Sequence, residues 1–220
     1  MTNFTLSPLA KPYIWAALFA LHSMPVLAAT LSARVTDASG KPLADAVVFA
    51  EPLAGVPPSK AGQAVAIEQK DREFAPYVTV IQAGTSLTFP NRDPMRHHVY
   101  SFSPAKPFEI KLYSGDITRE ILFDKPGIVT LGCNIHDWMV GYVFVAETPY
   151  FAKTDKNGEA KLGDLPAGEY DLKVWHPTQR NSAAKKPQKL ETNASIEAIF
   201  SVDAVPRKKK FKPPLDPLSY

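Results

Sequence analysis

Apolar and polar residues alternate with a period of two over many short runs of the chain, and this alternation is typical of half-buried β-strands. Clusters of glycine, proline, asparagine and aspartate separate the runs, as turns do between strands. No helical period persists along the sequence for more than about two turns. The chain is therefore predicted to be all-β, and the polar residues 178–187 are predicted to form a loop. Strands are expected at residues 31–36, 46–50, 65–69, 77–81, 86–89, 97–102, 108–113, 118–123, 128–131, 141–146, 150–154, 160–162, 169–175 and 195–202.

Residues 1–29 have a different pattern, which is typical of a secretory signal peptide. Lys11 supplies a positive charge, residues 13–21 are apolar, and small residues allow cleavage after Ala28 or Ala29. An uncleaved membrane anchor is the alternative, but this apolar run is shorter than the ~20 residues that a spanning helix needs. We therefore expect export to a bacterial periplasm, and we expect no transmembrane segment in the mature chain.

The composition describes an ordinary globular protein that is long enough for one large domain or two small ones. The chain has 220 residues, of which 45% are hydrophobic and 21% are charged. The formal net charge is only +3. The densest positive run lies in residues 205–220, a basic and proline-rich segment that we expect to be a disordered tail. Because the rest of the chain is nearly neutral, nucleic-acid binding is not expected.

The only cysteine of the chain lies on a short loop with two other side chains that bind metals. Cys133, His136 and Met139 follow one another at the spacing Cys-x₂-His-x₂-Met. A lone cysteine is most often a small buried apolar residue. In an exported chain, however, an unpaired thiol calls for intermolecular pairing or a metal, and the neighbouring side chains favour the metal. Two histidines, one cysteine and a weak axial methionine form a blue-copper site, and residues 94–99 offer the second histidine.

Two segments of the chain, residues 91–99 and 133–141, resemble those of the amicyanin-like blue-copper proteins, which belong to the cupredoxin family. The resemblance covers about residues 65–147. It implies a Greek-key β-sandwich that binds one copper ion, cycles between Cu(I) and Cu(II), and carries single electrons. It implies no catalytic residue, so the chain is not expected to be an enzyme. By position, the implied ligands are His97, Cys133, His136 and Met139.

The same resemblance implies a periplasmic redox partner, such as a dehydrogenase or a c-type cytochrome, in a setting such as methylamine utilisation. Trp138 and Val140 would surround His136 with apolar surface on which such a partner could dock transiently. Trp138 could equally be a core aromatic residue.

The sequence departs from the pattern of this family at two places. His98 stands where the family usually has asparagine, and strand alternation lets only one of His97 and His98 face a metal. We choose His97 and keep His98 as the alternative. Ile135 and Asp137 replace two prolines beside the loop histidine. Because proline has no N–H, Ile135 restores a donor toward the cysteine sulfur, which predicts a higher reduction potential than a proline-bearing loop has.

The flanking segments resemble the two halves of a carboxypeptidase regulatory-like, or transthyretin-like, β-sandwich. Residues 30–55 supply the first half and residues 148–204 the second. The predicted fold is therefore a cupredoxin domain at residues 64–147, nested in or next to a second small immunoglobulin- or transthyretin-like sandwich. Two independent domains in tandem remain the alternative.

Two other functions compete with electron transfer. The first is copper handling by a chaperone, buffer or resistance protein, with Met95, His97 and His98 forming a more open site. The second is an adhesive or carbohydrate-associated sandwich, which the flanking segments alone would permit. Hydrolysis is not expected, because the sequence contains no Gly-x-Ser-x-Gly elbow, no phosphate-binding glycine loop and no His-Glu-x-x-His motif.

Overall fold

The structure, a computed structural model, describes residues 28–57, 63–116, 119–181 and 185–207. Over these residues the chain forms strands and turns, which confirms the predicted all-β class. Nowhere in the described ranges is there a helix long and apolar enough to cross a membrane. The predicted signal peptide and tail fall almost entirely outside the described residues.

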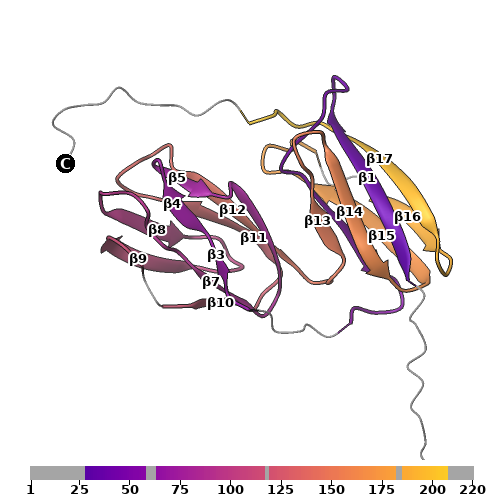
Figure 1. The fold of residues 1–220 in the computed structure, drawn as a ribbon, viewed down its shortest axis with the longest axis horizontal. Helices are drawn as coiled ribbons and strands as arrows, with labels where there is room; N and C mark the ends of the chain where they lie inside the picture. Colours follow the sequence, from indigo (N-terminus) through magenta and orange to yellow (C-terminus); the bar gives the residue numbers. More distant parts are fainter. Residues whose placement is uncertain (1–27, 58–62, 117–118, 182–184, 208–220) are drawn as a thin grey trace, which may run out of the picture.

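Strands from the two ends of the described chain build one sandwich, called here the outer sandwich (Figure 1). Its two sheets have the orders β14-β1-β17 and β13-β2-β15-β16. Between them lies a core that includes Leu31, Val48, Leu172 and Phe200. The strands are β1 (Ala29–Asp37), β2 (Val47–Pro52), β13 (Phe151–Lys153), β14 (Glu159–Leu165), β15 (Gly168–Trp175), β16 (Lys185–Leu190) and β17 (Ser195–Val202).

The strands between β2 and β13 build the inner sandwich, which has a separate core containing Phe74, Phe89, Leu131 and Val143. A five-stranded sheet has the order β6-β12-β11-β8-β9, a three-stranded sheet has the order β10-β7-β3, and β4 and β5 form a hairpin. The strands are β3 (Val65–Ala66), β4 (Glu68–Lys70), β5 (Glu73–Ala75), β6 (Val78–Gln82), β7 (Thr85–Thr88), β8 (His97–Ser101), β9 (Phe108–Tyr113), β10 (Ile121–Phe123), β11 (Gly127–Gly132) and β12 (Val140–Ala146).

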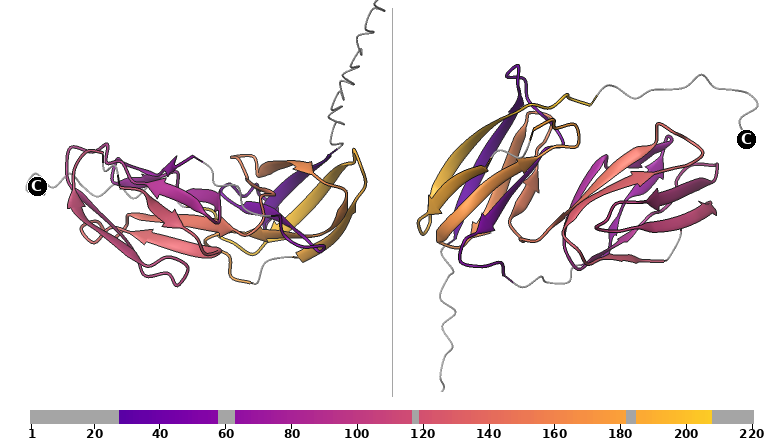
Figure 2. Two further views of the ribbon diagram at one scale, coloured as in Figure 1. Left: turned by 90° about the horizontal axis from the view of Figure 1, so that it is seen from below. Right: turned by 180° about the vertical axis from the view of Figure 1, so that it is seen from behind.

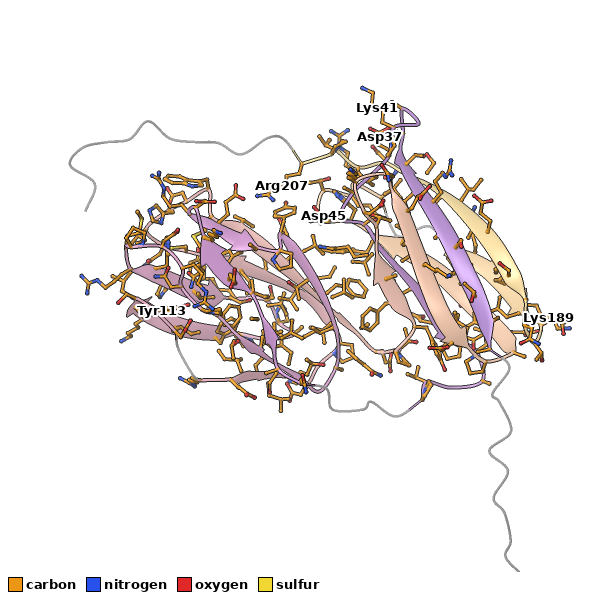
Figure 3. The ribbon with its side chains drawn as sticks, viewed as in Figure 1. Asp37, Lys41, Asp45, Tyr113, Lys189 and Arg207 are labelled. Atoms are coloured by element: carbon orange, nitrogen blue, oxygen red, sulfur yellow. The ribbon has the colours of Figure 1, made fainter. Side chains whose placement is uncertain are left out.

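The two sandwiches pack against each other through an aromatic junction, and Figure 2 shows them side by side from two further directions. The Phe49 and Phe144 rings lie 4.9 Å apart between centroids, and Trp175 lies 5.5 Å from Phe144. Lys153 donates to the Val78 carbonyl at 2.8 Å across the same junction. Strand β12 begins at the opposite end of the inner sandwich, where Figure 3 labels Tyr113, and reaches this junction at Phe144 and Ala146. That far end holds the candidate site.

One expected loop is a strand. Residues 185–187, predicted to lie in a loop, begin β16, which pairs with β15 from Gly168↔Leu190 to Lys173↔Lys185. The strand lies at the edge of its sheet and is mostly exposed. Its lysines and its proline therefore never produce the alternation that identifies a half-buried strand, and they suit an edge that must not pair further. The expected strand at 65–69 is divided between β3 and β4.

Candidate metal centre

The loop that carries the metal-binding motif connects two paired strands. Strand β11 ends at Gly132 and β12 begins at Val140, and these two residues form the last pair of the ladder. Cys133 and Met139 flank that pair and are buried in the inner core. The Met139 N–H donates to the His136 carbonyl at 2.8 Å, which closes a tight turn at the tip. The ladder therefore fixes the start and the end of a loop that can only curl back on itself.

Three atoms capable of binding a metal converge at this loop. The Cys133 sulfur lies 4.0 Å from Nδ1 of His97 and 4.0 Å from Nδ1 of His136. All three atoms lie within 4.8 Å of one another. Bonds of about 2.0 Å to nitrogen and 2.3 Å to sulfur would place two ligands of one ion roughly 3.5–4 Å apart. The spacing therefore matches ligands grouped around a single ion.

The two adjacent histidines of β8 point in different directions. The His97 ring lies beside the cysteine and is completely buried. The His98 ring instead places Nε2 2.9 Å from Glu109 Oε1 and lines a separate depression with Tyr100. The two rings point to opposite sides because successive side chains alternate along a strand. Both rings are nevertheless buried, and the pairing of β8 with β9 is irregular between His97 and Val99. The structure thus brings His97, and not His98, to the cysteine.

Asp93 holds the outer edge of His97. Its Oδ2 lies 2.8 Å from His97 Nε2, and its carboxylate also accepts the backbone N–H groups of Asp71 at 2.7 Å and Arg72 at 2.9 Å. A proton on Nε2 leaves the Nδ1 lone pair free to bind a metal, so the carboxylate selects the useful tautomer. Burial acts to lower the pKa of His97, but Cys133 and Asp93 raise the pKa above its ordinary value.

The surroundings of Cys133 favour the thiolate. Burial acts to raise the pKa of the thiol, but His97 and the backbone N–H groups of His98 and Ile135 outweigh burial and hold the pKa below its ordinary value. The donor at Ile135 is the one that the loop sequence predicts. Because a thiolate is the form of cysteine that binds metals, the site is prepared for an ion.

His136 is the half-buried member of the group and connects it with the surface. Burial lowers the pKa of His136, and the charges of His97 and Arg72 lower it further. The ring is therefore neutral near pH 7 and able to bind a metal through Nδ1. Its neighbour Trp138 lies 5.2 Å away between ring centroids and is partly exposed, and Ile135 is more exposed still. Apolar side chains thus surround the edge of His136, and Trp138 is not a core residue.

The donor set fits copper. Two imidazoles and a thiolate, with a buried thioether in the same cluster, form the combination that blue-copper sites use. A structural zinc site would take a fourth cysteine, histidine or carboxylate rather than a thioether, and here the carboxylate beside His97, Asp93, already contacts His97 and two N–H groups. The residues that would hold the ion are His97, Cys133, His136 and Met139.

Replacement of Ile135 by proline should lower the reduction potential of the copper-loaded protein, because it removes one N–H donor to the thiolate. One such hydrogen bond corresponds to a change on the order of 50 mV. A redox titration measures the difference, and Ile135→Val is the matched control because it keeps the N–H. A higher potential in the proline variant would contradict this reading of the loop.

Asp93 and the turn at Asp71 and Arg72 support the site, although no sequence motif marks them. Both turn residues have positive φ, at 55° and 58°, a conformation that usually favours asparagine and glycine. The Asn91 side chain shapes the loop that carries Asp93, since its amide donates to the Met95 carbonyl at 2.8 Å and accepts the Asp93 N–H at 2.9 Å. The only signal in the sequence was a carboxylate four residues before His97.

No protein-family model and no curated protein sequence matches this chain. Similar solved structures include a copper-containing nitrite reductase from Thermus scotoductus SA-01, with 26% identity over 44% of this chain and 25% of that chain, at a TM-score of 0.37. This chain therefore spans a quarter of the reductase. A purple cupredoxin from Nitrosopumilus maritimus shares 23% identity over 39% of this chain and 100% of that chain, at a TM-score of 0.33. A reduced amicyanin variant shares 19% identity over 38% and 82%, at 0.35. Cupredoxins are thus among the structures similar to part of this chain, as the sequence resemblance predicts.

Proposed function

We propose that the protein is an exported electron carrier with one type 1 copper ion bound by His97, Cys133, His136 and Met139. The observation that carries this proposal is the convergence of two Nδ1 atoms and one cysteine sulfur within 4.8 Å. The buried ladder end and the Asp93 carboxylate hold these groups in place before any ion arrives. Such preorganisation suits a site that must change its charge with little change in structure.

The roles of the residues follow from their positions. A bound copper ion would supply a couple between Cu(I) and Cu(II). Cys133 provides the thiolate, and His97 provides an imidazole that the inner core shields from water. His136 has the exposed edge, so an electron enters or leaves through this ring. Ile135 and Trp138 exclude water around that edge when a partner docks. No side chain in this arrangement needs to act on a substrate.

The partner is a periplasmic redox protein, such as a dehydrogenase or a c-type cytochrome. The exposed apolar rim around His136 supports a small contact of the kind used in transient electron transfer. Export also agrees with the position of Ala29, which is buried as the first residue of β1 and pairs with Leu165. Cleavage after Ala28 would leave this strand complete.

We further propose that the outer sandwich is one domain interrupted by the copper-binding domain. Strand β1 pairs both with β14 and, in parallel, with β17, so the two ends of the described chain share one sheet. Their side chains also share one core. The copper-binding domain is thus attached at both of its ends, beside the aromatic junction and away from His136.

The test is a visible and electron paramagnetic resonance spectrum of the mature protein after one equivalent of Cu(II) has been added. We expect an intense blue colour and narrow copper hyperfine splitting. A pale solution with ordinary splitting would overturn the proposal, because it indicates a nitrogen–oxygen site without the thiolate.

Copper transfer is the second candidate function, and the position of Met95 favours it. Met95 lines the same surface depression as His136, so a soft thioether lies where an ion could leave the site. Exchange of bound Cu(I) with a chelator separates the two functions. Exchange within seconds would favour transfer, whereas exchange over hours would favour electron carriage.

A further inference from the structure

A surface depression of about 610 Å³ lies directly beside His136. Arginines and apolar side chains line it together, and none of the described acidic residues does. It is therefore a surface where a positive charge and the exposed edge of the candidate copper ligand occur together. The lining residues are Arg72, Pro94, Met95, Arg96, Leu112, Ile135 and His136.

The two arginines of this depression have no carboxylate partner among the described residues. Arg92, in the same region, pairs with Glu68 at 3.1 Å and Asp116 at 2.6 Å. Neither Arg72 nor Arg96 makes a comparable ion pair in the described ranges. Both arginines line the depression, and a guanidinium group has the fork geometry that binds carboxylates.

Arg72 is fixed in place by the same carboxylate that holds the metal site. Its backbone N–H donates to Asp93 at 2.9 Å, and Asp93 also contacts His97. The turn at Arg72 has a left-handed backbone conformation that this pairing stabilises. The backbone that carries Arg72 is thus held beside the site before a partner arrives, and less order has to be imposed on this turn when the partner binds.

We propose that this depression receives an acidic surface of the redox partner, with partner carboxylates on Arg72 and Arg96 and apolar contact on Ile135 and Leu112. That the partner is a redox protein rests on the proposed function, but the preference for a negative surface does not. Asp71 is exposed in the turn that carries Arg72, and Asp137 is exposed in the loop that carries His136, yet neither lines the depression. Charges of this kind steer encounter and are weakened by salt, which suits a complex that must form and separate quickly.

The first experiment tests the charge preference without copper. Hexacyanochromate(III), a redox-inert paramagnetic trianion, is titrated into the metal-free protein at low salt, and amide signals are followed by NMR. We expect broadening centred on Arg72, Arg96 and Ile135. The Arg72→Gln/Arg96→Gln variant should lose this broadening. The control variant Arg34→Gln/Lys161→Gln removes the same charge from the outer sandwich and should keep the broadening. Broadening centred elsewhere, or unaffected by the first pair, would overturn the inference.

The second experiment uses the copper-loaded protein and two oxidants of opposite charge. Oxidation of the reduced protein by hexacyanoferrate(III) should be about tenfold slower in Arg72→Gln/Arg96→Gln, and the wild-type rate should fall as salt increases. Oxidation by tris(phenanthroline)cobalt(III), a trication, should be unchanged or faster. Equal slowing with both oxidants would contradict a charge preference. If the amide signals broaden as expected but the protein forms no blue copper site, the proposed function is refuted and the charge preference of the depression stands.

Discussion

Replacement of Cys133 by serine should abolish the intense visible absorption of the copper-loaded protein and lower its affinity for Cu(II) by at least about a hundredfold. The absorption of a type 1 site arises from the thiolate, and a serine hydroxyl stays protonated where the cysteine has a lowered pKa. The two imidazoles would remain 5.0 Å apart between ring centroids, so weak copper binding with an ordinary spectrum should persist. Titration with Cu(II), followed in the visible range and by electron paramagnetic resonance, measures both effects.

Two controls separate this effect from a change in folding. The variant should unfold at a similar denaturant concentration, because serine is nearly the same size as the cysteine it replaces in the core. Met139→Leu should keep a blue colour, because it removes only the weak axial ligand, and should change the potential instead. If Cys133→Ser retained the blue absorption, the ligand assignment would be wrong.

The period-two pattern predicted the all-β class because most strands are buried on one side. Strand β14 illustrates this, since Ala160 and Leu162 face the core while Lys161 is exposed. The rule fails at β16, an edge strand whose first three residues are exposed and whose only core residue is Leu190 at its end, so no apolar alternation marks it. Such a strand exists because its backbone completes a ladder with β15, and a backbone interaction leaves no mark on the side-chain pattern.

Only the part of the candidate site that lies on one short loop could be predicted from local sequence spacing. Cys133, His136 and Met139 lie on one short loop, so their spacing alone indicated a common ligand. The ring of His97 approaches them only because β8 pairs beside β11. The resemblance to amicyanin-like proteins supplied that contact, and the periodicity did not. The contact of Asp93 with a turn more than twenty residues earlier depends on tertiary structure, and no pattern in the sequence reveals it.

Replacement of Asp93 by alanine should weaken both the copper site and the fold of the inner sandwich. Burial acts to raise the pKa of Asp93, but the N–H of Arg72, the ring of His97 and the N–H of Asp71 hold the pKa below its ordinary value, so the group is a carboxylate near pH 7. Its loss leaves the His97 tautomer unselected, which should lower copper affinity by about 10- to 100-fold. The two freed N–H groups should reduce the free energy of unfolding by about 2–4 kcal/mol.

Asp155→Ala is the matched control, because Asp155 also accepts two backbone N–H groups, from Asn157 at 2.8 Å and Glu159 at 3.0 Å, in a turn of the outer sandwich. It contacts no histidine, so its removal should reduce stability without changing copper affinity. Chemical denaturation of the metal-free proteins gives the first quantity, and competition with a Cu(I) chelator gives the second. Equal copper affinity in the two variants would mean that Asp93 only stabilises the fold. A loss confined to Asp93→Ala would mean that this carboxylate positions His97 for the metal, in addition to holding, through the Arg72 N–H, the turn at the edge of the proposed docking surface.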